Sequence, residues 1–265
     1  MRSFFKLARR LLSYRDLRRD NGTLKTARFV LQSELRSSAK KLFQMNVKQQ
    51  NLWLRAGTPD YGVATYSLGQ ELSGLRWLFP QNTTGLIIDA GGYIGTSSLA
   101  LEKMFPEANH LSIEPSSENM ELLKRNISGR NIIPIKAALA PSGKEGNIEL
   151  YNRGTGEWGF TVVPKPHDRP ASFIEEVETI SLEKLIDRYG DGKALLVKMD
   201  IEGAEKALME EPAWLERVSV LIIELHERIE PGCEDAFLRA NRRRIVYRDQ
   251  GEKFLSIQPN DFVAA

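Results

Sequence analysis

The sequence has a single cysteine and no long apolar run. Cys233 alone excludes an internal disulfide and is typical of a protein in a reducing compartment. No apolar stretch approaches the roughly 20 residues of a membrane-spanning helix. The positive N-terminus is not followed by the uninterrupted apolar core of a cleaved signal peptide. We therefore expect a cytoplasmic protein.

Two common nucleotide-binding patterns are also missing. A dinucleotide fingerprint that starts at Gly91 would place glycines at positions 93 and 96, which are Tyr93 and Thr96. The phosphate-binding GxxxxGK[ST] pattern fails as well, since neither Lys-Ser nor Lys-Thr follows Gly95. The absence of both patterns argues against a ligand whose phosphate groups bind to this turn.

Positive charge is concentrated at the start of the chain. Residues 1–50 contain thirteen Lys and Arg but three Asp and Glu, so the remaining residues carry a net charge of −8 within a total of +2. A basic arm on an acidic body favours contact with the phosphate groups of lipids or nucleic acids. Because few aromatic residues alternate with the basic ones, we expect no nucleic-acid partner.

Apolar residues in this arm recur at helical spacing. Residues 4–19 and residues 24–42 predict two helices, separated by Asn21-Gly22. We therefore divide the chain into a basic helical extension, residues 1–80, and a second domain, residues 81–265. The apolar stripe of the extension either packs on that domain or on a twin subunit of a homo-oligomer, or residues 1–50 make a peripheral contact with an anionic membrane.

The most informative segment is a strand, a turn and a helix between residues 86 and 104. An apolar strand ends at Asp89, and the turn contains Gly91, Gly92 and Gly95. Such an edge of a doubly wound sheet binds nucleotides, and its glycines let the backbone approach a ligand closely. An acid two residues before the first glycine suits a cationic ligand without phosphates. S-adenosylmethionine, with its sulfonium and ammonium groups, is such a ligand.

A second acid supports a nucleoside site. Glu114 ends the next short strand, which begins at His110, and it follows the glycine turn by about twenty residues. A carboxylate at the tip of the second strand is placed to accept both ribose hydroxyls. Together with Asp89, it indicates a nucleoside site of the methyltransferase kind.

These segments resemble the FkbM family of S-adenosylmethionine-dependent methyltransferases. The resemblance is carried by residues 88–95, 113–126, 198–205 and 223–226, and it covers roughly residues 85–227. It implies O-methylation of a hydroxyl on a sugar, a glycan or a polyketide-type small molecule. The cofactor-binding residues that it implies are Asp89, Gly91, Gly92, Tyr93, Gly95, Glu114, Pro115 and Asn119.

The order of predicted elements indicates an α/β fold. Strands and helices alternate after residue 81, which predicts a mainly parallel sheet covered on both faces. The resemblance implies a Rossmann-like class I methyltransferase fold, with a seven-stranded sheet in which one strand is antiparallel. Residues 152–170 have little periodicity but contain Trp158 and Phe160. We interpret this segment as a lid over the acceptor pocket.

Candidate catalytic side chains follow the fourth and fifth strands. Asp200 and Glu202 follow one, while Glu224 and His226 follow the other. His226 suits the role of base, because histidine titrates near neutral pH. Alternatively, carboxylates here could hold a Mg²⁺ ion that acidifies the acceptor hydroxyl, with the metal ligands left undetermined. Lys198, inside an apolar strand, is expected to pair with an acid.

Two further functions are compatible with part of this pattern. One is an NAD(P)-dependent oxidoreductase or epimerase, which needs a helical Tyr-x-x-x-Lys. Tyr189 and Lys193 have that spacing, but two glycines between them predict a loop. The other is a non-catalytic nucleoside-binding module that the basic arm tethers to a partner.

Overall fold

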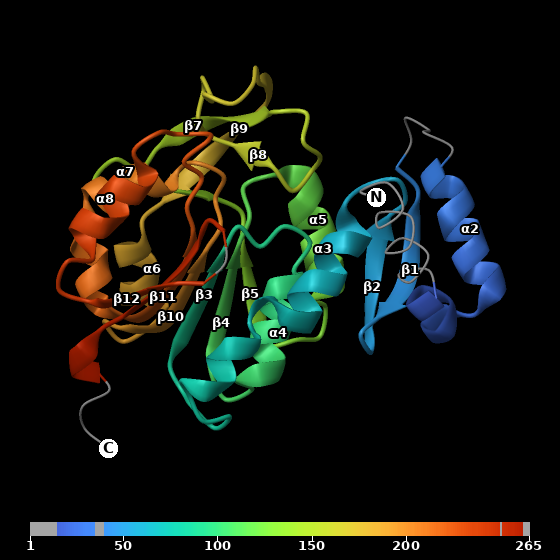
Figure 1. Cartoon of the computed structure of the whole chain (residues 1–265), viewed down its shortest axis with the longest axis horizontal. Helices are drawn as coiled ribbons and strands as arrows, with labels where there is room; N and C mark the ends of the chain where they lie inside the picture. Colours follow the sequence, from blue (N-terminus) through green and yellow to red (C-terminus); the bar gives the residue numbers. More distant parts are fainter. Residues whose placement is uncertain (1–14, 35–39, 250, 262–265) are drawn as a thin grey trace. The chain divides into compact units, whose positions relative to one another are not determined.

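The computed structural model describes residues 15–34, 40–249 and 251–261. The chain divides into two compact units, Met1–Ser73 and Gly74–Ala265 (Figure 1). The division falls slightly before the boundary that we expected between residues 80 and 81.

The smaller unit contains a β-hairpin as well as helices. Residues 15–21 are helical. The elements that follow are α2 (Thr23–Glu34), β1 (Leu42–Val47), β2 (Gln50–Arg55), α3 (Asp60–Tyr66) and a π-helical turn, η1 (Ser67–Glu71). The prediction of a second helix extending to Leu42 is therefore wrong, while residues 4–14 of the first predicted helix and 35–39 of the second lie outside the described residues. Lys48 and Gln49 both have positive φ, 51° and 68°, which is the backbone of a tight hairpin turn.

The apolar stripe on α2 is largely exposed in the described residues. Leu24 is 68% exposed and Leu31 is 64% exposed, while Phe29 is buried on the other side of the helix. None of the described helices is both long enough and apolar enough to cross a bilayer. The partner that this stripe meets, whether the larger unit, a twin subunit or a membrane surface, stays a prediction.

The larger unit is built on a seven-stranded sheet, as expected. Its strands are β3 (Leu86–Ala90), β4 (Asn109–Ile113), β5 (Ile132–Ile135), β10 (Ala194–Met199), β11 (Val218–Glu224), β12 (Ile245–Arg248) and β13 (Lys253–Ile257). Their order is β12-β13-β11-β10-β3-β4-β5. β13 pairs antiparallel with both β11 and β12, whereas the pairs from β11 to β5 are parallel. This order and the single antiparallel strand confirm the predicted Rossmann-like methyltransferase fold.

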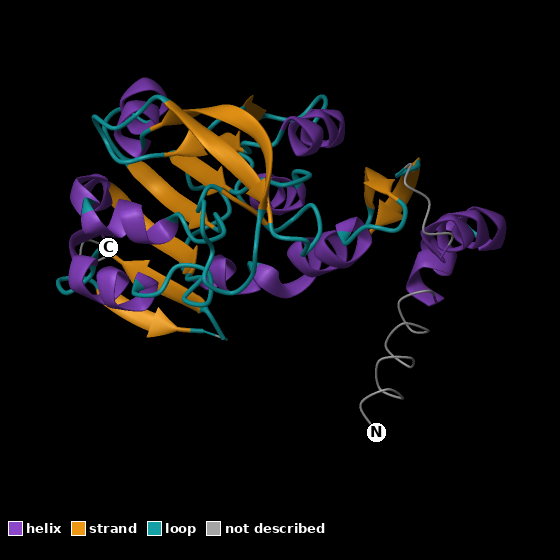
Figure 2. Ribbon diagram, turned by 90° about the horizontal axis from the view of Figure 1, so that it is seen from above, coloured by secondary structure: helices purple, strands orange, loops and turns teal. Residues whose placement is uncertain are grey.

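Helices cover the two faces of this sheet, as Figure 2 shows. They are α4 (Thr96–Met104), α5 (Ser117–Asn126), α6 (Leu182–Tyr189), α7 (Glu205–Glu210) and α8 (Cys233–Ala240), with 3₁₀ turns η2 (Ser73–Trp77), η3 (Pro212–Arg217) and η4 (Pro259–Asp261). Leu86, Ile88 and Ala90 of β3 share an apolar core with α6, α7 and α8. Side chains alternate along a strand, so Asp89 faces the opposite layer, where α4 lies. The carboxylate of Asp89 therefore lies on the face of the sheet that α4 covers, just below the glycine turn.

A second, four-stranded sheet interrupts the alternation between β5 and α6. Its strands are β6 (Ala138–Leu139), β7 (Asn147–Asn152), β8 (Phe160–Thr161) and β9 (Ser172–Ile180), in the order β6-β9-β7-β8. Figure 1 shows β7, β8 and β9 along one edge of the main sheet. The segment that we interpreted as a lid thus begins in β7 and includes β8, so it is more ordered than its composition indicated.

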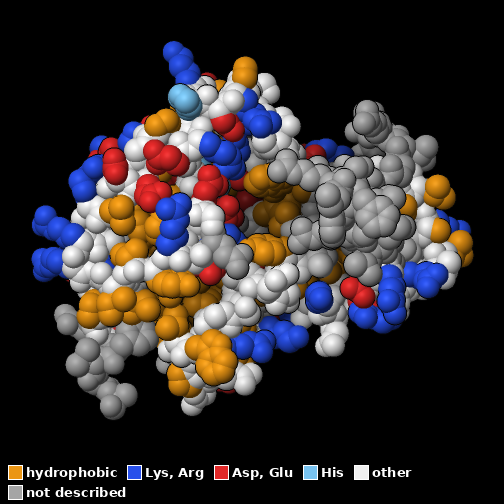
Figure 3. Space-filling model, viewed as in Figure 1, with side chains coloured by type: hydrophobic (Ala, Val, Ile, Leu, Met, Phe, Trp, Pro, Cys, Tyr) orange, Lys and Arg blue, Asp and Glu red, His pale blue; other side chains and the backbone are white. Residues whose placement is uncertain are grey.

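Acidic side chains gather on the visible face of the larger unit (Figure 3). This agrees with the net negative charge of residues 51–265.

The segment from Tyr189 to Lys193 is not helical, because α6 ends at Tyr189 and Gly190 caps it. The structure therefore lacks the helical Tyr-x-x-x-Lys of a short-chain dehydrogenase at this position.

We expect Gly91→Ala to destabilise the protein strongly. Gly91 has a φ of +84°, and a Cβ there would lie 1.8 Å from the backbone oxygen of Asp200, so backbone must move. We expect the free energy of unfolding in urea to fall by more than about 2 kcal/mol. Gly143→Ala is the matched control, since Gly143 has a φ of +79° with nothing within 4 Å, and should lose about 1 kcal/mol. Equal losses for the two variants would contradict this account of Gly91.

Candidate functional site

The glycine turn is closed by contacts with its own sheet. The N–H groups of Gly91 and Gly92 both donate to the backbone oxygen of Ile113, at 3.0 and 2.9 Å. A Cβ on Gly92 would lie 2.3 Å from Oγ of Ser112, and Gly95 adopts a φ of +87° at the start of α4. The sequence suggested that a ligand requires these glycines. In the structure, the backbone of Asp200, just after β10, crowds Gly91, while Ser112 of β4 and Leu123 of α5 crowd Gly92.

Asp89 is buried beneath this turn. Its Oδ2 accepts hydrogen bonds from the hydroxyls of Ser97 and Ser98 at 2.7 and 2.5 Å. Its Oδ1 is buried, accepts no hydrogen bond within the described part of the chain, and lies 3.4 Å from Nζ of Lys198. The carboxylate therefore fixes the start of α4 against β3 and keeps one oxygen for charge–charge contact.

Glu114 lies at the tip of β4 and is held by three donors. Oε2 accepts the N–H of Tyr93 at 2.9 Å, while Oε1 accepts the N–H of Ser116 at 3.0 Å and Nδ2 of Asn119 at 3.3 Å. Asn119 also donates to the backbone oxygen of Glu157. Pro115, between Glu114 and Ser116, is half-buried. The glycine turn, the tip of β4 and the segment after β7 thus meet around one buried carboxylate.

Lys198 joins this region to the next strand end. Its Nζ lies 3.4 Å from Oδ1 of Asp89 and 3.7 Å from Oδ2 of Asp200, and it donates to the backbone oxygen of Gly91 at 3.4 Å. The expectation that Lys198 pairs with an acid is confirmed. A buried ammonium between two carboxylates offsets their mutual repulsion.

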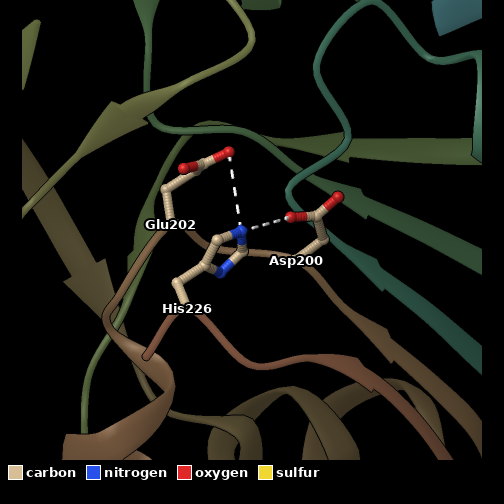
Figure 4. A group of neighbouring side chains, drawn as sticks. All are labelled: Asp200, Glu202 and His226. Atoms are coloured by element: carbon tan, nitrogen blue, oxygen red, sulfur yellow. Dashed lines mark ion pairs between the residues drawn. The ribbon is translucent and has the colours of Figure 1, made fainter. Parts of the chain in front are cut away.

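Asp200, Glu202 and His226 come together at the ends of β10 and β11 (Figure 4). Nε2 of His226 lies 3.7 Å from Oδ1 of Asp200 and 3.7 Å from Oε1 of Glu202. Among these side chains, that of Asp200 is 29% exposed, whereas those of Glu202 and His226 are 4% and 1% exposed. Asp200 is therefore the member of the cluster that a substrate can reach.

Glu205 orients the histidine, a role that sequence reasoning missed. Its Oε1 lies 2.9 Å from Nδ1 of His226 and also accepts the N–H of Ile201, while Oε2 accepts the N–H of Gly203. Burial lowers the pKa of His226, but the charge and hydrogen bond of Glu205 and the charges of Glu202 and Asp200 outweigh it and raise that pKa to about 10. With no metal ion beside it, such a histidine is protonated at neutral pH, so it donates hydrogen bonds and does not act as a base unaided.

The two carboxylates of the cluster are shifted in opposite directions. Burial raises the pKa of Glu202 to about 7, against the attraction of His226. Burial also acts to raise the pKa of Asp200, but the charges of Lys198 and His226 lower it overall. Glu202 has a φ of +51°, a left-handed backbone that costs a non-glycine residue about 1–2 kcal/mol. Strain at a residue within a charged cluster is a feature of functional sites.

Arg153, which sequence reasoning also missed, covers this cluster. Its guanidinium is fully buried and contacts Oε2 of Glu202 at 2.5 Å and Oδ2 of Asp168 at 2.7 Å. The hydroxyl of Thr161 donates to the backbone oxygen of Glu202, and the N–H of His167 donates to the backbone oxygen of Ile229. The segment that we interpreted as a lid therefore packs directly on the acidic cluster. In the sequence, Arg153 is only a charged residue just after a strand, with Asp168 fifteen positions later. That pattern is too weak to predict that Arg153 covers the acidic cluster.

Glu224 lies at the edge of the cluster. Its carboxylate is 3.4 Å from Nζ of Lys253, and its pKa is raised by burial and by the charge of Asp200. Two groups of side chains have the geometry to hold a metal ion: Asp200, Glu202 and His226, and, second, Glu224, His226 and Glu252. Within each group the possible ligand atoms lie within 4.8 Å of one another. The carboxylates that the sequence offered for a metal ion, those of Asp200, Glu202 and Glu224, thus all lie near His226.

The chain belongs to the FkbM methyltransferase family, because residues 89–254 match the family model described as "Methyltransferase FkbM domain". This confirms the resemblance that we found in the sequence. "Methyltransferase 1" of Beauveria bassiana (strain ARSEF 2860) is 27% identical over 145 residues, which cover 48% of this chain and 57% of that protein. The chain thus spans little more than half the length of the curated relative it matches.

Solved structures of other methyltransferases are similar at low sequence identity. The 16S rRNA N2 G1207 methyltransferase of T. thermophilus, solved with AdoMet and guanosine, has a TM-score of 0.45 and 10% identity over 82% of this chain and 50% of that one. A precorrin-6y C5,15-methyltransferase from Geobacter metallireducens has a TM-score of 0.40 and 12% identity over 86% and 94%. Both scores are below 0.5, so the fold assignment rests on the strand order itself.

We expect Arg153→Gln to weaken the packing of the lid. The substitution leaves two carboxylates, those of Glu202 and Asp168, without their shared buried cation. We expect a loss of about 3 kcal/mol in the free energy of unfolding, measured in urea. Arg169→Gln is the control, since Arg169 also faces Asp168 but is 49% exposed, and should change stability by less than about 0.5 kcal/mol. Similar losses for both variants would refute a special role for Arg153.

Proposed function

We propose that this chain transfers a methyl group from S-adenosylmethionine to a hydroxyl of a sugar, a glycan or a polyketide-type small molecule. The observation that carries the proposal is the joining of two sites by Lys198. The glycine turn with Asp89 and Glu114 lies at one strand end, and the acidic cluster lies at the end of the adjacent strand. Donor and acceptor must meet in this way for direct transfer.

The residues at the turn fit such a methyl donor. Buried Oδ1 of Asp89, which accepts no hydrogen bond within the described part of the chain, supplies negative charge for a cationic end. Lys198 supplies positive charge for the donor's carboxylate. Glu114 is fixed by backbone and amide N–H groups at the end of the second strand, a position from which a carboxylate can accept ribose hydroxyls. We therefore assign the turn residues and Asn119, which holds Glu114, to donor binding.

The acidic cluster suits the acceptor side of the reaction. In methyl transfer, the acceptor oxygen forms a bond to the methyl carbon while the carbon–sulfur bond breaks, so the sulfonium becomes a neutral thioether. The hydroxyl proton must leave, and partly exposed Asp200 can accept a hydrogen bond from that hydroxyl. Nζ of Lys198 and Nε2 of His226 each lie 3.7 Å from Asp200 and attract its carboxylate, and the segment with Arg153 excludes water. Alignment of the three atoms can contribute about 7–11 kcal/mol to the lowering of the barrier.

Donor binding should be selective and should depend on Glu114. We expect calorimetry to show one S-adenosylmethionine bound per chain and no heat with NAD⁺. Glu114→Gln should weaken donor binding at least about tenfold, which is about 1.4 kcal/mol. Glu107→Gln is the control, because Glu107 is exposed before the opposite end of β4. Binding of NAD⁺ in place of the methyl donor would overturn the proposal.

Asp200→Asn should slow the chemical step with donor binding kept. The amide cannot take up the acceptor proton, so we expect turnover to fall on the order of 100-fold. Transfer of a labelled methyl group to sugar and polyketide acceptors, followed by product mass, measures turnover and identifies the product. An Asp200→Asn enzyme that retains wild-type turnover would remove Asp200 from the mechanism. Bound donor without a methylated product in any acceptor pool would favour a nucleoside-binding module instead.

A further inference from the structure

The imidazole of His226 is held in one orientation by a carboxylate behind it. Nδ1 lies 2.9 Å from Glu205, and Glu205 is itself fixed by two backbone N–H groups. Nε2 therefore faces Asp200 and Glu202 (Figure 4). A carboxylate that orients a histidine from its far nitrogen is the usual arrangement around metal-bound histidines.

The distances around Nε2 leave room for an ion. Asp200 Oδ1 and Glu202 Oε1 each lie 3.7 Å from it, which is too long for a hydrogen bond. The three ligand atoms lie within 4.8 Å of one another. Bonds of about 2.0–2.2 Å to one central ion place its ligands about 3–4 Å apart, so the observed spacing matches a shared ion better than direct contact.

One oxygen of Glu202 accepts no hydrogen bond within the described part of the chain. This oxygen is Oε1, which is fully buried. The side chain as a whole is 4% exposed. Its other oxygen, Oε2, is taken by Arg153. Asp200 divides its oxygens in the same way, with Oδ2 toward Lys198 and Oδ1 toward Nε2. A buried carboxylate oxygen without a donor is costly unless a cation meets it.

We propose that Asp200, Glu202 and His226 bind a divalent transition-metal ion, such as Zn²⁺ or Mn²⁺, in preference to Mg²⁺. An imidazole nitrogen favours such ions, whereas Mg²⁺ prefers oxygen ligands and retains its waters. Glu224, one of the carboxylates that the sequence offered for a metal ion, contacts Lys253. The alternative is a plain ion cluster in which a proton on Nε2 of His226 takes the place of the ion.

The role that we give to this ion in methyl transfer rests on the proposed function. The exposed part of Asp200 leaves one side of the cluster accessible to an acceptor hydroxyl. A bound divalent ion would supply positive charge that lowers the pKa of that hydroxyl. Metal binding itself requires neither the donor nor the acceptor, so it can be measured apart from methyl transfer.

The test is metal binding by the chelator-treated full chain without any methyl donor. We expect calorimetry with ZnCl₂ and MnCl₂ to show one ion per chain, at least 100-fold tighter than with MgCl₂. Bound Co²⁺ should give a visible absorption band that Zn²⁺ abolishes. Glu202→Gln and His226→Gln should each weaken binding more than tenfold, and Glu205→Gln, which alters a positioning residue, should weaken it 10- to 100-fold.

Controls separate this site from its neighbours and from a folding defect. Asp200→Asn alters the partly exposed ligand and should lose metal affinity with an unchanged circular dichroism spectrum. The double variant Glu224→Gln/Glu252→Gln should bind metal like the wild type; loss of binding there would place the ion in the second group and overturn the proposal. Absence of a stoichiometric ion, or equal affinity for Mg²⁺, would overturn it as well. Metal binding by a chain that binds no methyl donor would refute the proposed function and leave the metal site standing.

Discussion

The buried ammonium of Lys198 is the contact on which the arrangement of both sites depends. It lies in register with Asp89 on the adjacent strand and within 4 Å of both Asp89 and Asp200. Without this cation, the buried carboxylate of Asp89 and the partly exposed one of Asp200 would repel each other at neighbouring strand ends. The same contact draws the loop after β10 toward the end of β3, and the backbone of Asp200 then leaves no space for a side chain at Gly91.

A second layer of charged groups fixes the cluster that faces the acceptor. Glu205 sets the direction of His226 from the start of α7, where backbone N–H groups are available to hold a carboxylate. Arg153 approaches from the opposite side and neutralises one oxygen of Glu202. Because both supports are buried, the orientation of His226 and Glu202 does not depend on solvent-exposed side chains. The cost is a left-handed backbone at Glu202, which the surrounding contacts must offset.

The four-stranded sheet explains how an irregular segment becomes a cover. β7 and β9 pair with each other and bring the chain between them over the end of β10. Within that connection, Thr161 and Arg153 bind Glu202, and the backbone of Glu157 meets Asn119. One connection therefore touches both Asn119, which holds Glu114 at the tip of β4, and the acidic cluster.

The order of strands and helices in the larger unit was predictable from the sequence, because burial imposes a local pattern. Fully buried parallel strands read as short apolar runs, and the acids and glycines that follow them mark their carboxyl ends. The helix predicted to reach Leu42 was wrong, since positions 35, 39 and 42 fit helical spacing while residues 42–47 pair with β2. Pairing with a later strand is a tertiary contact, and local periodicity does not contain it.

The sequence by itself determined the fold class, the family and the positions of Asp89, Glu114, Asp200, Glu202 and His226 at the strand ends. Only the tertiary structure decided which groups surround them. Arg153, Glu157 and Asp168 reach the site through pairing between distant strands, and Glu205 acts through the path of one loop. Such contacts depend on three-dimensional distance, which a linear pattern of residues does not encode, so the charge state and orientation of His226 became visible only once the chain was folded.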